Sequence, residues 1–290
     1  MLRVLAGLMW LYNVVWKNPP DFGRNSNSGL YEFTSAAVDH PVFPPFSWVV
    51  EHLVLPNFLL FGWLTLVLET VLAVLLLTGT FVRIAALLGI GQSLAIGLSV
   101  AEAPGEWPWS YFMMIGIHIV LLCTWSTRYF AVDAVRAQTR RGDGPHAAAS
   151  LLRTWGIVLA LLGVAALIAS FQTGRWASVG GLVGTEDLQV GLGNYNLAGA
   201  IAVLVVAAFA LAGAIRGSRE LAYAGAALAV LAAVSIYLQS SRTDVWLGGT
   251  NTTAAVFLCA ALVSVATGRL LRRPHRVAGA ASKIMHPGGA

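Results

Sequence analysis

The hydropathy pattern divides the chain into long apolar runs separated by short polar connections. Eight of these runs come close to the roughly 20 residues that a helix needs to cross a hydrocarbon layer of about 30 Å. They cover residues 2–17, 53–78, 83–101, 109–128, 151–171, 196–215, 221–239 and 253–271. The pattern predicts an all-α polytopic membrane protein with about eight transmembrane helices, arranged as two four-helix halves.

The polar connections define the predicted units. Residues 1–135 form the first four-helix membrane unit and include a large outer loop at 18–52, long enough to be either functional or disordered. The run LYEFTSAAVDH inside this loop predicts a short interfacial helix. A basic cytoplasmic linker at 136–150 leads to a second four-helix unit at 151–271. The basic, glycine-rich tail at 272–290 is expected to be disordered and to lie near anionic lipid headgroups.

Composition supports the membrane assignment. Hydrophobic residues make up 57% of the chain and charged residues only 11%, whereas a soluble domain carries about 25% charged residues. The net charge of +5 does not indicate a nucleic-acid partner, because basic residues in a membrane protein are distributed by topology. The bilayer itself is the first expected partner.

The positions of lysine and arginine predict the orientation, since cytoplasmic loops carry an excess of both. With the amino terminus inside, all but four of the 18 basic residues fall on the cytoplasmic side. The exceptions are Lys17, Arg24, Arg175 and Arg242. We therefore expect both termini in the cytoplasm.

Three polar side chains fall deep inside the predicted spans of the first unit. Glu69 is the single acid within 53–78, while Gln92 and His118 lie near the middle of the next two spans. A charged group at such depth costs a few kcal/mol unless it is paired, protonated or facing a cavity. We expect Glu69 to lie within hydrogen-bond reach of Gln92 or His118, directly or through one water or ligand. A Glu–His pair can hold or relay a proton. The alternative is a purely structural set of hydrogen bonds that takes part in no reaction.

The outer ends of the spans supply further candidates. Trp109 and Tyr111 are either interfacial anchors or the lining of a path for a flat quinone headgroup, because Tyr111 and His118 lie two turns apart on one helix face. Lys17 is the basic residue at the outer end of the first span. It is either a snorkelling lysine or a contact for an anion, and His52 lies at the other end of the outer loop.

Several cofactor classes lack a sequence signature. His118 alone of the six histidines lies within a span, which argues against a haem held by two histidines. Cys123 and Cys259 form no CxxC motif, and neither a Walker A loop nor a dinucleotide-binding fingerprint is found. We therefore expect no haem or metal, and quinone only as a diffusible acceptor.

The first half, roughly 2–135, resembles the DoxX/DoxD membrane family. The matching motifs are LRVLAGLMWLYNVVWK ending in Lys17, LETVLAVLLLTGTFVRIAALLG, and EWPWSY at the start of the fourth span. Where the family pattern usually has glycine a few residues before the lysine, this chain has Asn13-Val14, so Asn13 is an extra polar candidate. The resemblance implies a four-helix unit in a prokaryotic cytoplasmic membrane. Some relatives are subunits of thiosulfate:quinone oxidoreductase, and others are linked to thiol redox balance.

Two functional hypotheses follow. The first is a membrane subunit of a quinone-linked oxidoreductase that acts on thiosulfate or a thiol at the outer face, together with a partner protein subunit. Its candidate residues are Glu69, His118 and Gln92 for proton transfer, Trp109, Tyr111 and Asn13 for quinone, and Lys17 and His52 for the donor. The second is a non-catalytic scaffold, or a lipid- or small-solute-binding module, for a partner oxidoreductase. A second copy of the chain is a further candidate partner in either case.

Overall fold

A computed structural model describes residues 1–173, 183–184, 189–190, 192–239 and 246–271. These residues are helical apart from turns, connections and one antiparallel pair of two-residue strands, β1 (Val183–Gly184) and β2 (Gln189–Val190). The helices, in chain order, are α1 (Leu2–Val15), α2 (Gly29–Asp39), α3 (Pro44–Val49), the π-helix η1 (Val50–Val54), α4 (Phe58–Thr78), α5 (Val82–Val100), α6 (Trp109–Cys123), α7 (Val132–Thr139), α8 (Gly144–Thr173), α9 (Leu197–Arg216), α10 (Arg219–Leu238) and α11 (Asn251–Gly268). The predicted tail at 272–290 lies outside the described residues.

Within the described part of the chain, six helices are long and apolar enough to cross a membrane: α4, α5, α8, α9, α10 and α11. The protein is therefore a multi-pass membrane protein. Two of the eight predicted spans are shorter helices, α1 with 14 residues and α6 with 15. Helix α6 ends five residues before the predicted boundary at 128, because the backbone becomes extended at Thr124 (φ −113°, ψ 162°).

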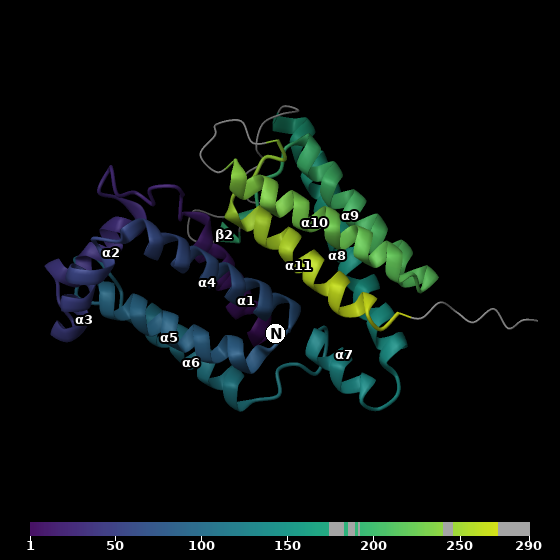
Figure 1. Ribbon diagram of the computed structural model, residues 1–290, viewed down its shortest axis with the longest axis horizontal. Helices are drawn as coiled ribbons and strands as arrows, with labels where there is room; N and C mark the ends of the chain where they lie inside the picture. Colours follow the sequence, from purple (N-terminus) through teal and green to yellow (C-terminus); the bar gives the residue numbers. More distant parts are fainter. Residues whose placement is uncertain (174–182, 185–188, 191, 240–245, 272–290) are drawn as a thin grey trace, which may run out of the picture.

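The helices form two groups (Figure 1). In the first group α1 packs against α4 and α5 against α6; in the second, α8 packs against α9 and α10 against α11. Helices α2 and α3 cover one end of the first group, and α7 lies at the opposite end. The helix predicted within 18–52 is present as α2, and this predicted loop is thus a folded cap that contacts α5 through α2.

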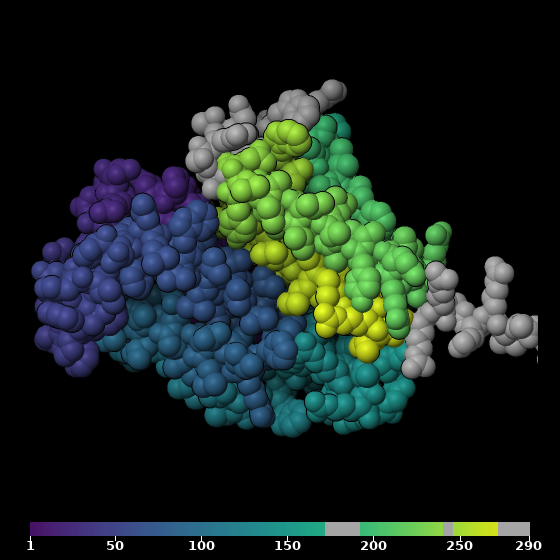
Figure 2. Space-filling view, viewed as in Figure 1, coloured from purple at the N-terminus to yellow at the C-terminus, as the bar shows by residue number. Residues whose placement is uncertain are grey.

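Helix α11 joins the two groups. It is the most buried of the six long helices and contacts α1, α4 and α8 as well as α10. Figure 2 shows α11 in yellow between the green helices of the second group and the blue helices of the first group. Leu72 and Leu76 of α4 share one hydrophobic core with Cys259 and Val263 of α11. The two predicted four-helix units therefore bury their apolar faces against each other, and the predicted linker 136–150 is itself mostly helical, within α7 and α8.

At one end of the molecule, two arginine side chains donate hydrogen bonds to main-chain carbonyl oxygens at or near the ends of helices. The Arg3 guanidinium donates to the carbonyl oxygens of Leu76 and Leu77 at the end of α4, and to that of Phe130 (2.8 Å) before α7. In the second group, Arg219 Nε donates to the Leu271 carbonyl oxygen (2.6 Å). The last four carbonyl groups of a helix lack the usual partner within the helix, and Arg3 supplies a donor to two of them at the end of α4.

Candidate functional site

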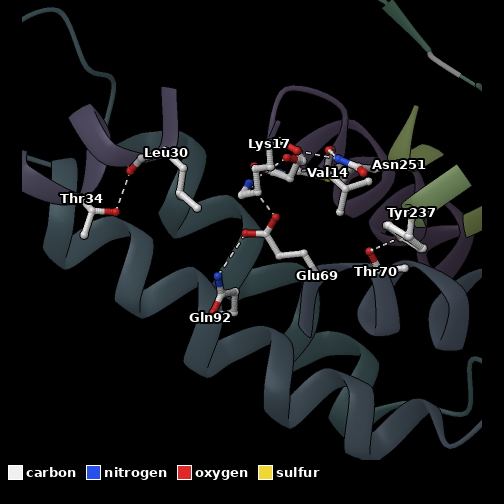
Figure 3. A network of polar contacts seen from close by, with 11 residues as sticks. Val14, Lys17, Leu30, Thr34, Glu69, Thr70, Gln92, Tyr237 and Asn251 are labelled. Carbon is white, nitrogen blue, oxygen red and sulfur yellow. Dashed lines mark hydrogen bonds and ion pairs between the residues drawn. The ribbon is translucent and has the colours of Figure 1, made fainter. Parts of the chain in front are cut away.

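The deepest charged site is an ion pair between Lys17 and Glu69. Lys17 Nζ lies 2.6 Å from Glu69 Oε2, and the two residues are 1% and 0% exposed. Lys17 directly follows the last turn of α1, and Glu69 lies on the buried face of α4 beside Leu66 and Ala73. The expectation that Lys17 snorkels outward or meets an external anion is wrong, because its ammonium group points inward to the carboxylate (Figure 3).

Gln92 of α5 completes the coordination of the carboxylate. Its Nε2 donates a 3.1 Å hydrogen bond to Glu69 Oε1, so each carboxylate oxygen faces one donor group. The predicted contact between Glu69 and Gln92 is therefore present (Figure 3). Three helices meet at this point: the end of α1, the middle of α4 and the middle of α5.

The surroundings of Lys17 compensate for the loss of water around its charge. Nζ also donates to the Asn13 carbonyl oxygen at 2.7 Å, and it lies 3.9 Å from the centre of the Trp16 ring. Cation–π contacts of this kind contribute up to about 2 kcal/mol when desolvated. Asn13 thus takes part through its main chain, while its side-chain amide donates to the Met9 carbonyl oxygen (3.1 Å).

The second helix group holds Lys17 in place. Asn251 Nδ2, at the start of α11, donates to the carbonyl oxygens of Val14 (2.8 Å) and Lys17 (2.6 Å). Thr70 directly follows Glu69, and its hydroxyl lies 3.4 Å from the Tyr237 hydroxyl of α10 (Figure 3). The sequence analysis did not identify Asn251. The signal that could have identified it is an amide side chain just before the predicted span 253–271, at the same expected depth as the end of the first span.

His118 does not join this network. Its Nε2 accepts a 2.9 Å hydrogen bond from Trp10 Nε1, and its Nδ1 lies 2.6 Å from the Met114 carbonyl oxygen. Since Nε2 accepts, Nδ1 must carry the proton and donate it to that carbonyl. Both ring nitrogens are occupied, so the structure brings Gln92, and not His118, to Glu69. The ring fits against Gly89 of α5, where an added Cβ would lie 2.2 Å from His118 Cδ2.

The remaining predicted residues lie apart from the ion pair. Trp109 is 64% exposed and packs edge-on against Phe112, as expected for an interfacial anchor. The Tyr111 hydroxyl donates to Glu106 Oε2 (2.5 Å). His52 is half exposed and stacked on Trp48. None of these three side chains has a described hydrogen bond or ion pair to Lys17, Glu69 or Gln92.

Chemically, the site is a neutral acid–base pair enclosed in apolar surroundings. Moving the proton from the ammonium to the carboxylate keeps the net charge at zero, whereas gain or loss of a proton leaves one net charge in a medium that solvates it poorly. Among the described residues, no group of three or more His, Cys, Asp or Glu side chains could hold a metal ion.

Comparison with known proteins returned no match: no family model, no curated protein and no solved structure matches this chain. Kinship with the DoxX/DoxD family therefore stays a prediction from the motifs of the first half. The fold and the site define a multi-pass membrane protein with a buried, charge-compensated carboxylate.

Proposed function

We propose that this protein is a membrane subunit of a quinone-linked oxidoreductase in a prokaryotic cytoplasmic membrane, with both termini in the cytoplasm and Lys17 toward the outer side. The electron donor is thiosulfate or a thiol, and a partner protein subunit supplies any bound redox group. The observation that carries the proposal is the position of Gln92, which links the enclosed ion pair to the exposed face of α5.

Gln92 is the partly exposed member of the network, and it contacts Glu69 directly. Leu88, about one turn before Gln92 on α5, is an exposed apolar side chain, as expected for a helix face that meets lipid. An added Cβ at Gly91 would meet nothing within 4 Å. A quinone dissolved in the bilayer would therefore reach the Gln92 amide first, and its carbonyl oxygen would accept a hydrogen bond from that amide.

Reduction of a quinone to a quinol takes up two electrons and two protons. In this proposal the electrons come from the donor, for example from two thiosulfate ions that join as tetrathionate. The Lys17–Glu69 pair holds a proton two hydrogen bonds away from the quinone oxygen, with the Gln92 amide between them. Because a net charge on the pair is costly in hydrocarbon, proton release to the quinone would be coupled to proton uptake by the pair.

Binding of a quinone analogue to the purified protein tests the proposal. Wild-type protein should bind a ubiquinone or menaquinone analogue, and Gln92→Leu and Glu69→Gln should each weaken binding at least several-fold. Gln138→Leu, the same substitution on α7 away from the site, should bind as wild type. Failure of the wild type to bind, or equal binding by all variants, would rule out a quinone site here.

The second candidate is a non-catalytic scaffold or a lipid- or small-solute-binding module for a partner oxidoreductase. It is favoured by the nearly complete enclosure of Lys17 and Glu69, which is what a structural lock between α1, α4 and α5 would require. A deletion strain with normal thiosulfate- and thiol-linked respiration, but with dissociated membrane complexes, would support this candidate over the first.

A further inference from the structure

A cavity of about 150 Å³ opens at the end of the first helix group, between the start of α5 and the segment that follows α6. It lies near the helix ends fastened by Arg3, beyond the last turn of α4 and away from the Lys17–Glu69 pair. Its lining residues are Val82, Arg83, Leu121, Thr124, Trp125, Ser126, Thr127 and Asp133. The volume is roughly ten times what a single water requires, so the cavity has room for a small polyatomic group.

The lining contains a polar group without a protein partner. Ser126 Oγ is buried and has no hydrogen-bond partner among the described residues. Buried hydroxyl groups in folded proteins are nearly always hydrogen-bonded, to protein or to ordered water, so Ser126 needs a partner that the described residues do not supply. The adjacent residue Thr127 also lines the cavity, and its hydroxyl is a second candidate donor to the same ligand.

The charge around the cavity favours an anion. Arg83 forms no ion pair with any described carboxylate, and its guanidinium carbon lies 5.9 Å from the centre of the Trp125 ring. The one acid in the lining, Asp133, is already engaged: Oδ2 accepts from the Val82 amide (3.2 Å), and Oδ1 binds Arg136 (2.9 Å). The amino end of α5, which carries partial positive charge, faces the same space.

The position of the cavity identifies the class of ligand. Trp125 is 83% exposed, and Tyr129, also highly exposed, carries Arg128 over its ring. Exposed Trp and Tyr beside arginine mark the level of the lipid headgroups, and basic pockets between helices on the cytoplasmic side suit anionic headgroups. Val82 and Leu121 give the cavity an apolar side, against which the glycerol and acyl chains of a lipid could lie.

We propose that this cavity is a phosphate-binding site, in which Arg83 pairs with the phosphate charge and the Ser126 and Thr127 hydroxyls donate hydrogen bonds to its oxygens. The shared chemistry is a phosphate group, and its source is either an anionic lipid headgroup or free phosphate. The site is independent of the proposed redox role, since no residue belongs to both.

Native mass spectrometry of the purified protein tests the site with three probes: phosphatidic acid, the diacylglycerol with the same acyl chains, and inorganic phosphate. We expect retention of phosphatidic acid and not of diacylglycerol. Arg83→Gln should weaken retention about tenfold, as expected for loss of a charge-assisted hydrogen bond, and Ser126→Ala should weaken it several-fold. Arg140→Gln, which removes an exposed charge from the same end of the molecule, should have no comparable effect.

Competition between inorganic phosphate and phosphatidic acid shows where the bound phosphate comes from. If millimolar inorganic phosphate displaces phosphatidic acid, the site takes free phosphate; if it does not, the site is specific for a lipid headgroup. The proposal is overturned if diacylglycerol is retained as well as phosphatidic acid. It is also overturned if Arg83→Gln and Arg140→Gln weaken binding equally, or if Ser126→Ala, a variant that should keep its fold, binds as wild type.

Discussion

The side-chain amide of Asn251 donates a 2.6 Å hydrogen bond to the main-chain carbonyl oxygen of Lys17. This bond joins the start of the last helix to the residue whose ammonium group neutralises Glu69. The second helix group therefore contributes to the site, because Asn251 of α11 donates to the carbonyl oxygens of Val14 and Lys17 at the end of α1. A first group expressed alone would lack this contact.

The Lys17–Glu69 pair should behave as a coupled unit in a double-mutant cycle. Lys17→Met or Glu69→Leu alone leaves one buried charge without its partner, and each should lower the free energy of unfolding by about 3–5 kcal/mol. The double variant should recover most of this loss, because two apolar side chains of similar size replace both charges. Denaturant unfolding in mild detergent measures the four free energies; additive losses would contradict the direct pairing.

Asn251→Ala should destabilise the protein by about 2 kcal/mol, since the Lys17 carbonyl oxygen loses its side-chain donor and the Val14 carbonyl oxygen keeps only a 3.4 Å bond from the Lys17 amide. Asn57→Ala is the matched control, because Asn57 makes a single exposed hydrogen bond to the Leu53 carbonyl oxygen and should change stability by less than about 0.5 kcal/mol. Thermal unfolding in detergent gives both values. Equal losses of stability in the two variants would mean that the hydrogen bonds from Asn251 do not stabilise the protein more than an exposed one does.

Gly89→Ala and Gly91→Ala should differ, although the two glycines lie two residues apart on α5. A Cβ at Gly89 would overlap the His118 ring at 2.2 Å, whereas one at Gly91 would enter open space. We expect the Gly89 variant to lose about 1–3 kcal/mol through overpacking. The Gly91 variant should gain up to about 1 kcal/mol from helix propensity. Similar melting temperatures for both variants would show that the His118 ring does not pack against Gly89.

The proposed orientation predicts which residues react with a membrane-impermeant maleimide in intact cells. In a variant with Cys123 and Cys259 replaced by alanine, Asn25→Cys in the outer cap should be labelled without lysis. Arg140→Cys, at the end of α7, should be labelled only after lysis. Both positions are exposed, so accessibility is set by the side of the membrane. The reverse pattern would invert the topology.

The class of the protein and the depth of its polar residues could both be predicted from the order of residues along the chain. Long apolar runs predict membrane-spanning helices, because a helix satisfies its own backbone hydrogen bonds without water. The single acid in such a run identified Glu69 as the residue to explain, and similar depth predicted its contact with Gln92 or His118.

Only the tertiary structure decided which groups of similar depth actually meet. Hydropathy reports how deep a residue lies but not which way its helix is rotated, so it could not separate Gln92 from His118 as the partner of Glu69. The His118 ring instead accepts a hydrogen bond from Trp10. A lysine at a helix end has the same sequence pattern whether its flexible side chain reaches outward to water or inward to an acid. Lys17 turns inward because Glu69 and the backbone contact from Asn251 lie on that side.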